Sequence, residues 1–322
     1  MTQETKSNYK KRGKVRRAIW SIVALLLVGA IGVCGYEYAN VKHAADKSYK
    51  SAGLTKDENG AKNSLIKNKK PISILLTGTD TGALGRSDKG RTDSIMVVVV
   101  NPKTETTTAV SFERDLQVNL PDYPNYSPSK LNAAYTYGGI SELAKVLKNY
   151  FKIPINAYGM INMGGMKSII DKIGGVDITP TLSFTYDGYT FTKGRLTHMN
   201  GDKALAYSRM RYDDPQGDYG RQARQRQLLG AIVKSNADIS SLLSSSFISS
   251  LSDQVRTDLT FDDLTSMGLN YRKAGKNVVS DYTHGTGFYQ DGVSYQSISR
   301  DERQRISNVI RQAMGMNTAT VE

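Results

Sequence analysis

An uncharged, apolar stretch close to the N-terminus is the feature that most restricts how this chain can fold. Residues 18–36 (AIWSIVALLLVGAIGVCGY) carry no charged side chain, whereas residues 1–17 contain seven Lys or Arg residues and only one Glu. A helix of about 20 apolar residues spans a bilayer. Trp20 and Tyr36 stand near the two ends of the stretch, where interfacial aromatic residues are typical. We therefore predict one N-terminal transmembrane helix over residues 18–36.

The charges beside this stretch also predict its orientation. Basic flanking segments remain in the cytoplasm, so residues 1–17 are expected to form a cytoplasmic tail and the rest of the chain to lie outside the cell. A cleaved signal peptide would have a shorter apolar core and an A-x-A-like cleavage site, which residues 35–37 (GYE) do not provide. A lipoprotein signal would place a small residue before its cysteine, but Val33 precedes Cys34. An uncleaved anchor is favoured over both alternatives.

Cysteine content and net charge agree with a location outside the cell. Cys34 is the only cysteine, so no intrachain disulfide can form and the exported part has no thiol. The formal net charge is +13. The part of this excess that lies outside the basic tail suits an anionic cell wall, lipid phosphates or another polyanion. The predicted location argues against nucleic acid as a partner.

Continuous apolar segments predict a sheet that is covered on both faces. They span residues 71–76, 94–100 and 107–112, and strands without alternation are typical of sheets buried between two helical layers. Shorter strands are expected at 155–161, 176–179 and 278–282. Apolar residues at helical spacing predict helices at 141–150, 163–173, 222–234, 238–252, 261–273 and 301–314.

This order of elements predicts the domain organisation. Residues 71–315 are expected to form a single three-layer α/β/α domain with a central mixed sheet. Residues 37–70 are polar and lack sustained periodicity, which is typical of an extracellular stalk or linker. Residues 316–322 are expected to form a short C-terminal tail.

Two aspartates flank a loop that joins the first two predicted strands. Gly78-Thr79-Asp80 ends the first strand, and Gly90-Arg91-Thr92-Asp93 leads into the next. If these strands lie side by side, Asp80 and Asp93 converge, and two carboxylates with substrate phosphates are a typical Mg²⁺ site. The alternative is that both aspartates only cap turns or strands. The loop lacks the G-x-x-x-x-G-K-[ST] and G-x-G-x-x-G spacings of nucleotide-binding loops.

A second charged group, Phe112-Glu113-Arg114-Asp115, follows the third predicted strand. Charged residues at a strand end often face solvent, and this interpretation stays open. Beside the aspartate loop, however, Arg114 would be placed to bind a phosphate, because its guanidinium group is planar and permanently charged.

An arginine-rich segment provides the third group of candidate residues. Residues 205–227 surround an acidic turn and include Arg209, Arg211, Arg221, Arg224 and Arg226. We expect a helical turn at 202–206 and an extended segment at 207–211, which would place Arg209 and Arg211 on one face. In the helix that follows, Arg221, Arg224 and Gln225 would share another face. Ordered arginines in this number predict a phosphate or pyrophosphate ligand.

Other interpretations of this segment and of the chain have less support in the sequence. Asp213, Asp214 and Asp218 could pair with the arginines in a surface network, although this would leave positive charge over. The three histidines, His43, His198 and His284, lie far apart and lack zinc-ligand spacing. No G-x-S-x-G motif indicates a serine hydrolase.

Taken together, these segments resemble the LytR–CpsA–Psr family of Gram-positive cell-wall proteins. The matching motifs are, in order, 75–80 (LLTGTD), 90–94 (GRTDS), 111–115 (SFERD), 130–135 (KLNAAY), 174–176 (GGV) and 200–227. The basic tail, single anchor and extracellular α/β domain match the layout of the family as well. Thr92-Asp93-Ser94 stands where Ser-Asp-Thr is commoner, which is a conservative departure.

The resemblance implies a phosphotransferase in the cell membrane of a Gram-positive bacterium. Such enzymes take a glycopolymer, either a teichoic acid or a capsular or rhamnose-type polysaccharide, from a polyprenyl-pyrophosphate carrier. They attach it to a sugar hydroxyl of peptidoglycan through a phosphodiester. The implied partners are therefore the lipid-linked glycopolymer, peptidoglycan and the membrane, and the apolar helices and strands would enclose the polyprenyl tail.

The resemblance also implies roles for individual residues. Asp80 and Asp93 would hold Mg²⁺ or Mn²⁺, and Asp93 or Asp115 would help to deprotonate the sugar hydroxyl. Lys130 and Asn132 would shape the rim of the site, and Gln225 would support the pyrophosphate. The arginines expected to grip the pyrophosphate are Arg91, Arg114, Arg209, Arg211, Arg221 and Arg224.

Two alternatives to the transferase remain open from the sequence. A pyrophosphatase would use the same site with water in place of the sugar hydroxyl, and its product would be free polymer. A non-catalytic regulator or wall-binding protein would need only the basic surface. Replacement of Arg114 or Asp93 by alanine would then leave its function largely intact.

Overall fold

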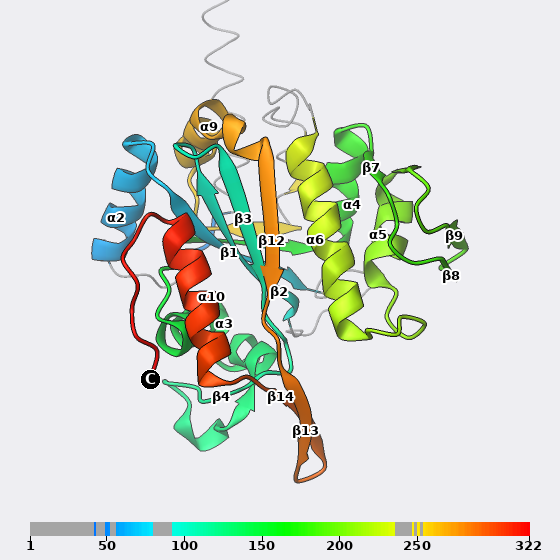
Figure 1. Ribbon diagram of the computed structural model, residues 1–322. Coiled ribbons are helices and arrows are strands. Elements are labelled where there is room, and N and C mark those ends of the chain that lie inside the picture. Colours follow the sequence, from blue (N-terminus) through cyan, green and yellow to red (C-terminus); the bar gives the residue numbers. More distant parts are fainter. Residues whose placement is uncertain are drawn as a thin grey trace, which may run out of the picture.

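The computed structural model describes residues 42, 49–51, 56–79, 92–235, 247, 250–251 and 254–322. Its centre is a six-stranded sheet (Figure 1). The spatial order of the strands is β11 (Val255–Thr257), β6 (Ala157–Asn162), β1 (Ile72–Thr79), β2 (Thr92–Asn101), β3 (Thr106–Ser111) and β12 (Asn277–Tyr282). β6 is parallel to β1 and β12 is parallel to β3, whereas the other neighbours are antiparallel. The predicted α/β domain with a central mixed sheet is confirmed.

Helices cover both faces of the sheet, because its strands are apolar on both sides. On β1, Leu75 packs in the cluster formed with α3 (Leu131–Phe151) and α10 (Arg300–Ala313). Ile72 and Ile74 point to the other face and pack with α2 (Lys56–Lys67) and α9 (Phe261–Asn270). Farther along this second face, α4 (Met163–Lys172) packs on β6 and α6 (Asp218–Lys234) packs on β3 and β12, while α5 (Gly201–Arg209) packs on α4 and α6 (Figure 1).

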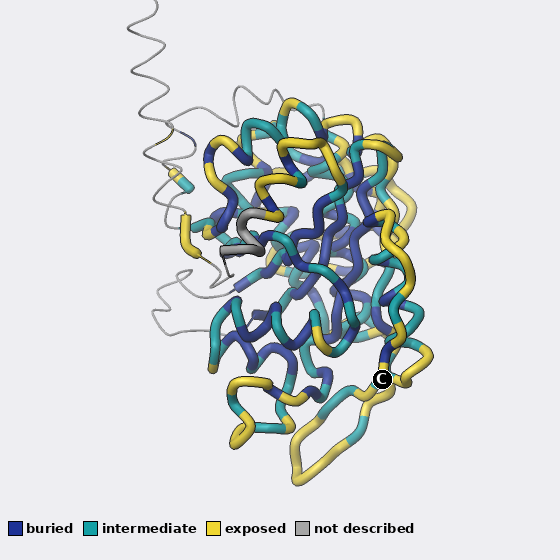
Figure 2. Tube along the Cα trace, turned by 90° about the vertical axis from the view of Figure 1, so that its left-hand side faces the viewer, coloured by how far each residue is buried: buried dark blue, intermediate teal, exposed yellow. Residues whose placement is uncertain are grey.

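The structure also contains short strand pairs and turns outside the central sheet. They are β4 (Gln117–Val118) with β5 (Ser129–Lys130), β7 (Val176–Ile178) with β10 (Thr197–Met199), β8 (Phe184–Tyr186) with β9 (Tyr189–Phe191), and β13 (Thr286–Gln290) with β14 (Val293–Ser297). Two 3-10 turns are η1 (Pro124–Tyr126) and η2 (Arg272–Gly275). The β13–β14 hairpin projects from the domain and is largely exposed (Figure 2). Of these elements, only β7 was predicted.

The folded domain begins earlier than the predicted boundary at residue 71. Helix α2 lies within the segment expected to be a stalk, and its Ile66 is buried against the sheet. Lys62 of α2 is also buried, and its ammonium group donates to the carbonyl oxygen of Asp258. The sequence did not predict this helix, because most of its residues are polar and its apolar face is narrow. Tyr49 also pairs with Thr257 of β11, so a stalk can occupy only residues that precede Tyr49.

The C-terminal boundary is also corrected. Val321 is buried, and its backbone N–H donates to Gln304 Oε1 at 2.9 Å. Its carbonyl oxygen accepts from Arg300 Nε at 2.9 Å. Residues 316–322 therefore pack on α10 and are not a free tail.

The predicted transmembrane helix, residues 18–36, lies outside the described residues, as does most of the predicted helix 238–252. None of the helices within the described ranges has the length and apolarity that crossing a membrane requires.

One prediction about local structure was wrong. The segment 207–211 was expected to be extended, but α5 continues to Arg209 after an N-cap in which the Asn200 side chain accepts from Lys203 N–H. The helix expected at 141–150 is confirmed as the second part of α3, which a break at Gly139, whose φ is 69°, separates from a shorter helical part that precedes it. Helix α9 begins with a capping box formed by Thr260 and Asp263.

Candidate active site

Asp93 and Arg114 form the centre of the candidate site, because the start of β2 lies beside the end of β3. The two strands are antiparallel, with Met96 opposite Ser111, and Arg114 follows β3 closely. Its Nη1–H donates to Asp93 Oδ1. Burial alone would lower the pKa of Arg114, but Asp218, Asp93 and Asp115 raise it above its ordinary value. The guanidinium group is therefore held charged among three carboxylates.

Asp115 joins this centre to the start of α3. Lys130 Nζ donates to Asp115 Oδ1 at 2.9 Å, and Arg114 Nε lies 3.6 Å from Asp115 Oδ2. The backbone N–H of Asn132 donates to the carbonyl oxygen of Arg114 at 3.0 Å. The Asn132 side chain is buried, and its Oδ1 makes no hydrogen bond within the described part of the protein. The three predicted residues Asp115, Lys130 and Asn132 thus lie together beside Arg114.

Asp218, the first residue of α6, contacts two of the predicted arginines, Arg221 of the same helix and Arg211 of the preceding loop. Arg221 Nη2 donates to the carbonyl oxygen of Asp93 at 3.1 Å and lies 2.7 Å from Asp218 Oδ1. Arg211 Nε lies 3.6 Å from the same Asp218 oxygen. Burial lowers the pKa of Arg221, while the charge of Asp218 opposes this effect. Asp218 therefore holds Arg221 beside Asp93 and also contacts Arg211, a role that the sequence did not reveal.

Arg224 differs from its neighbours, because its donors are directed into the protein. Its side chain is 2% exposed. Its Nε donates to the carbonyl oxygen of Tyr207 at 3.0 Å, and its other nitrogens bond to the Met210 carbonyl oxygen and to Asp214. These contacts tie α5 to α6 and do not support the predicted role of Arg224 in pyrophosphate binding.

An apolar cavity of about 330 Å³ opens beside these charged residues. It lies between the sheet and helices α4, α5 and α6, and Leu76, Met96, Leu205, Leu228 and Ile232 are among the residues that line it. Asp93, Arg209 and Gln225 also contribute to its lining. The Arg209 side chain is 35% exposed, and its guanidinium group lies 3.9 Å from the carboxylate of Asp187. The predicted residues Arg209 and Gln225 therefore share a surface with Asp93.

Asp80 and Arg91, which were predicted to bind the metal and the pyrophosphate, lie outside the described residues. Within the described ranges, no group of three or more His, Cys, Asp or Glu side chains could hold a metal ion. The strand register nevertheless suits the prediction. Thr79, which precedes Asp80 in the chain, pairs with Thr92, which precedes Asp93. Two hard carboxylate ligands from adjacent strands fit Mg²⁺ when a substrate supplies further oxygens.

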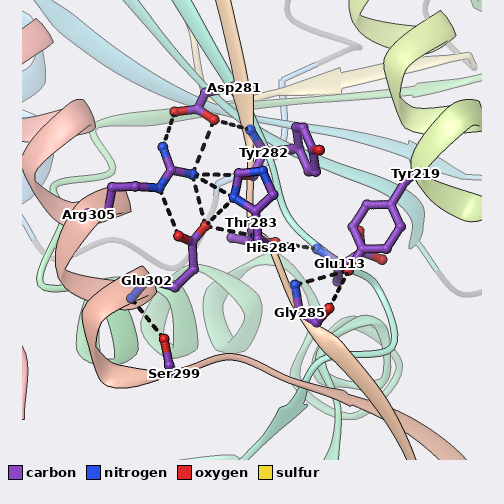
Figure 3. A network of polar contacts seen from close by, with 10 residues as sticks. All are labelled: Glu113, Tyr219, Asp281, Tyr282, Thr283, His284, Gly285, Ser299, Glu302 and Arg305. Atoms are coloured by element: carbon purple, nitrogen blue, oxygen red, sulfur yellow. Dashed lines mark hydrogen bonds and ion pairs between the residues drawn. The ribbon is translucent and has the colours of Figure 1, made fainter. Parts of the chain in front are cut away.

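Glu113 is a buried acid beside the site that the sequence did not single out. Gln222 Nε2 donates to its Oε1 at 2.9 Å. Burial raises the pKa of Glu113 to about 7, and the negative charge of Asp218 adds to this effect. Figure 3 shows it near Tyr219, whose hydroxyl accepts from Gly285 N–H at 3.0 Å. Its position within the motif Phe112–Asp115 was visible in the sequence, but its burial depends on α6.

The raised pKa of Glu113 predicts a pH-dependent stability difference. The unfolded chain releases this proton near pH 4.5, whereas the folded protein keeps it until about pH 7, so stability falls as the pH rises through this window. We expect the stability of Glu113→Gln relative to wild type to increase by about 3 kcal/mol between pH 4.5 and pH 7.5. Urea unfolding of both proteins across this range measures the difference. Parallel pH profiles would contradict the assignment.

The arrangement has the chemistry of a site for an amphiphile with an anionic head. The apolar cavity can bury a hydrocarbon chain. Arg114 and Arg221 place their guanidinium groups beside Asp93, and Arg211 lies next to Asp218. Guanidinium groups match phosphate oxygens in geometry and charge. The carboxylates Asp93 and Asp115 are available as proton acceptors or metal ligands.

Comparison with known proteins agrees with this chemistry. The LytR_cpsA_psr family model matches residues 35–312. A relative from Enterococcus faecalis, named polyisoprenyl-teichoic acid–peptidoglycan teichoic acid transferase TagU, is 40% identical over 302 residues, or 94% of this chain and 97% of its own length. A solved structure from E. faecalis described as a transcriptional regulator has a TM-score of 0.69 and 32% identity over 79% of this chain and 91% of its own. B. subtilis TagU has a TM-score of 0.60 and 29% identity over 78% and 100%. The chain belongs to the LytR_cpsA_psr family.

Proposed function

We propose that this protein is a phosphotransferase that attaches a glycopolymer to peptidoglycan from a polyprenyl-pyrophosphate carrier. The observation that carries this proposal is the apolar cavity whose lining includes Asp93, next to the guanidinium groups of Arg114 and Arg221. A lipid chain and a pyrophosphate joined in one molecule are complementary to these two surfaces. The name of the TagU relative supports a teichoic acid as the polymer, with capsular or rhamnose-type polysaccharide as the other candidate.

The reaction exchanges one phosphate ester bond for another. An oxygen of the peptidoglycan sugar forms a bond to the phosphorus that carries the glycopolymer. The bond from this phosphorus to the bridging oxygen breaks, and polyprenyl monophosphate leaves with the electron pair. The sugar hydroxyl loses its proton to a carboxylate. No external energy source is required, since the pyrophosphate bond supplies the driving force.

The charged residues would stabilise this transfer mainly through electrostatics. Phosphoryl transfer requires little covalent help from a protein, but it requires the charge on the phosphate oxygens to be neutralised and the groups to be positioned. Asp93 and Asp218 already orient the Arg114 and Arg221 side chains, so these side chains need to reorganise little when the ligand binds. Arg211 and Arg209 extend the positive surface toward the cavity.

The carboxylates have two proposed roles. Asp93, together with Asp80, would hold Mg²⁺ or Mn²⁺, which when bound would neutralise charge on the pyrophosphate. Asp115 contacts both Arg114 and Lys130, and it is the carboxylate that we propose for accepting the hydroxyl proton once Asp93 is engaged by the metal. Protonation of Asp115 would release Lys130 from their ion pair.

The predicted transmembrane helix, residues 18–36, lies outside the described residues, but its prediction agrees with this function. Residues 18–36 would anchor the protein in the bilayer that also contains the carrier lipid. Tethering an enzyme and its substrate to the same surface raises their effective concentration. The domain would therefore face the wall while its lipid cavity remains close to the membrane.

The cavity makes a specific prediction about lipid length. Leu205→Glu should lower kcat/KM for a long-chain polyprenyl donor by at least about tenfold, because each buried methylene contributes about 0.8 kcal/mol and the new carboxylate would disrupt the apolar lining. The effect should shrink with a short-chain donor, which fills less of the cavity. Steady-state kinetics with the two donors measures this change.

Leu269→Glu is the matched control for this experiment. Leu269 also lies on a helix but is 74% exposed and lines no part of the cavity. It should behave as wild type with both donors. Equal losses for long-chain and short-chain donors in Leu205→Glu would show that the cavity does not hold the lipid.

Product analysis tests the reaction itself. The full chain in nanodiscs would be incubated with a polyprenyl-pyrophosphoryl oligosaccharide, Mg²⁺ and peptidoglycan oligomers, and the products identified by mass spectrometry. The proposal predicts a phosphodiester-linked adduct together with polyprenyl monophosphate. Free sugar phosphate without an adduct would instead identify a pyrophosphatase. An unchanged donor that still binds would favour a non-catalytic role.

A further inference from the structure

A second cavity, lined by tyrosines, lies on the opposite face of the sheet from the lipid cavity. Its volume is about 400 Å³. Tyr135 and Tyr158 in its lining belong to the core cluster on the α3 side of the sheet, whereas the apolar cavity lies under α4, α5 and α6. Met160 of β6 contributes to the lining of both cavities. The other lining residues are Lys50, Ser51, Tyr123, Tyr137, Gly138, Gly139, Ile140, Ser141 and Arg256.

The aromatic rings here form an accessible platform and are not only part of the core. Tyr126 and Tyr137 are stacked with ring centroids 4.4 Å apart, and Tyr123 lies 6.0 Å from Tyr137. Tyr126 is 56% exposed and Tyr137 is 37% exposed. A tyrosine ring offers an apolar face and a hydroxyl at its edge. A pyranose sugar has the complementary structure, because its C–H groups form an apolar face and its hydroxyls surround the ring.

The backbone of α3 is shaped to leave this space open. A Cβ atom on Gly138 would lie 2.8 Å from Tyr123 Cε2 and 2.3 Å from Glu142 Cβ, so a side chain there would displace a wall of the cavity. Gly139 has a φ of 69° and interrupts the helix at the cavity. Glycine at these two positions is therefore required by the local geometry, which favours a built cavity over an incidental gap.

The charge of the cavity indicates an anionic ligand. Lys50 and Arg256 contribute to the lining, and no Asp or Glu is among the described residues that line it. Arg256 is exposed and lies near enough to Tyr135 and Tyr158 to influence both phenols electrostatically. A sugar that carries a carboxylate or a phosphate would match both the rings and the cations.

The first turn of α3 connects this cavity to the candidate active site. Asn132 donates its backbone N–H to Arg114, and Tyr135 follows three residues later, about 5 Å along the helix axis. Attacking and leaving oxygens lie roughly in line in phosphoryl transfer. If the leaving polyprenyl phosphate has its chain in the apolar cavity, the attacking hydroxyl approaches from the side on which the tyrosines lie.

We propose that the tyrosine-lined cavity binds an anionic sugar of the acceptor glycan. The free lactyl carboxylate of a muramoyl sugar that carries no stem peptide would contact Lys50 or Arg256, while a sugar ring packs on Tyr137. This inference rests on the proposed function for the identity of the acceptor, but saccharide binding itself can be measured without catalysis.

Calorimetric titration of the full chain in nanodiscs tests this assignment. The probe is a peptidoglycan tetrasaccharide without stem peptides, whose lactyl groups end in free carboxylates. Tyr137→Ala should weaken its binding about tenfold, because it removes the exposed stacking ring, whereas Tyr137→Phe should remain within about twofold of wild type. Tyr289→Ala is the matched control, because Tyr289 is 80% exposed on the β13–β14 hairpin and away from the cavity.

Arg256→Gln provides the test of charge. It should weaken binding of the tetrasaccharide but leave the binding of chitotetraose, a neutral sugar oligomer, unchanged. A glycerol-phosphate oligomer serves as the donor-side probe. If Tyr137→Ala weakens that probe and not the tetrasaccharide, the cavity binds the donor polymer and the assignment to the acceptor is overturned.

Kinetics separates failure of this inference from failure of the proposed function. Tyr137→Ala should raise KM for peptidoglycan about tenfold and leave KM for the donor unchanged. Tetrasaccharide binding that depends on Tyr137, in a protein without transferase activity, would support the cavity and refute the reaction. Transfer that proceeds with equal acceptor KM in wild type and Tyr137→Ala would support the reaction and refute the cavity.

Discussion

Arg114→Ala is expected to lower kcat/KM for glycopolymer transfer by about a thousandfold, since loss of one preorganised cationic donor at a phosphoryl-transfer site has an effect of this order. Arg114 contacts Asp93 and lies beside Asp115, so its guanidinium group is held where the pyrophosphate is proposed to bind. Arg114→Lys retains the charge but loses the planar fork and should recover only part of the activity. Steady-state kinetics with a lipid-linked oligosaccharide and peptidoglycan fragments measures both variants.

Arg272→Ala is the control for a general effect of removing positive charge. Arg272 is exposed in η2 and distant in sequence from the site motifs. Its loss should change kcat/KM by less than about twofold. Melting temperatures of all three variants would show whether the fold is retained. A folded Arg114→Ala protein with activity within threefold of wild type would contradict the proposed site.

Arg224→Met is expected to destabilise the protein by about 3–5 kcal/mol, since removal of one partner leaves a buried charge without compensation. Arg224 pairs with Asp214, whose side chain is also buried, and donates to two backbone carbonyl oxygens that end α5. Methionine retains most of the volume but none of the donors. Urea unfolding of the variant and of wild type measures the difference in free energy.

The stability of Arg209→Met, compared with that of Arg224→Met, shows how much of the destabilisation depends on burial of the arginine. Arg209 lies in the same arginine-rich segment, but it is 35% exposed and its carboxylate partner Asp187 is 3.9 Å away. Its replacement should cost less than about 1 kcal/mol. Combining Arg224→Met with Asp214→Asn should recover part of the lost stability, because the unpaired carboxylate is removed as well. Equal effects of the two arginine substitutions would show that Arg224 has no special structural role.

Much of the sheet could be predicted from the sequence, because its strands are buried on both faces. The segments around Ile74, Val97 and Val110 are apolar without alternation, and each lies in the sheet at the expected position. The same property placed Asp93 and Arg114 at adjacent strand ends. Their contact follows from β2 and β3 being neighbours, which short connections favour.

The arginine-rich segment shows where residue type is insufficient. Arg221 and Arg224 are three residues apart on α6, and both were predicted to bind pyrophosphate. The structure directs Arg221 toward Asp93 and Arg224 toward Asp214. This difference depends on how α5 packs on α6, which local sequence does not encode. The N-cap at Asn200 was the overlooked signal that residues 207–209 are helical.

Sequence patterns also do not predict either of the two cavities. The apolar cavity requires Leu76 of β1, Leu205 of α5 and Leu228 of α6 to face one another without filling the space between them. Each residue alone is indistinguishable from a core leucine. The tyrosine-lined cavity lies where α3 is interrupted at Gly139 and brings together residues from distant parts of the sequence.

A crystal structure of the protein with a polyprenyl-pyrophosphoryl sugar analogue, made stable by a methylene bridge between the phosphorus atoms, would test the central claim most directly. We expect the lipid chain to lie in the apolar cavity beneath α5 and α6, and the phosphate oxygens to lie within hydrogen-bonding distance of the Arg114 and Arg221 guanidinium groups. A lipid bound elsewhere, or phosphates that contact neither arginine, would contradict it.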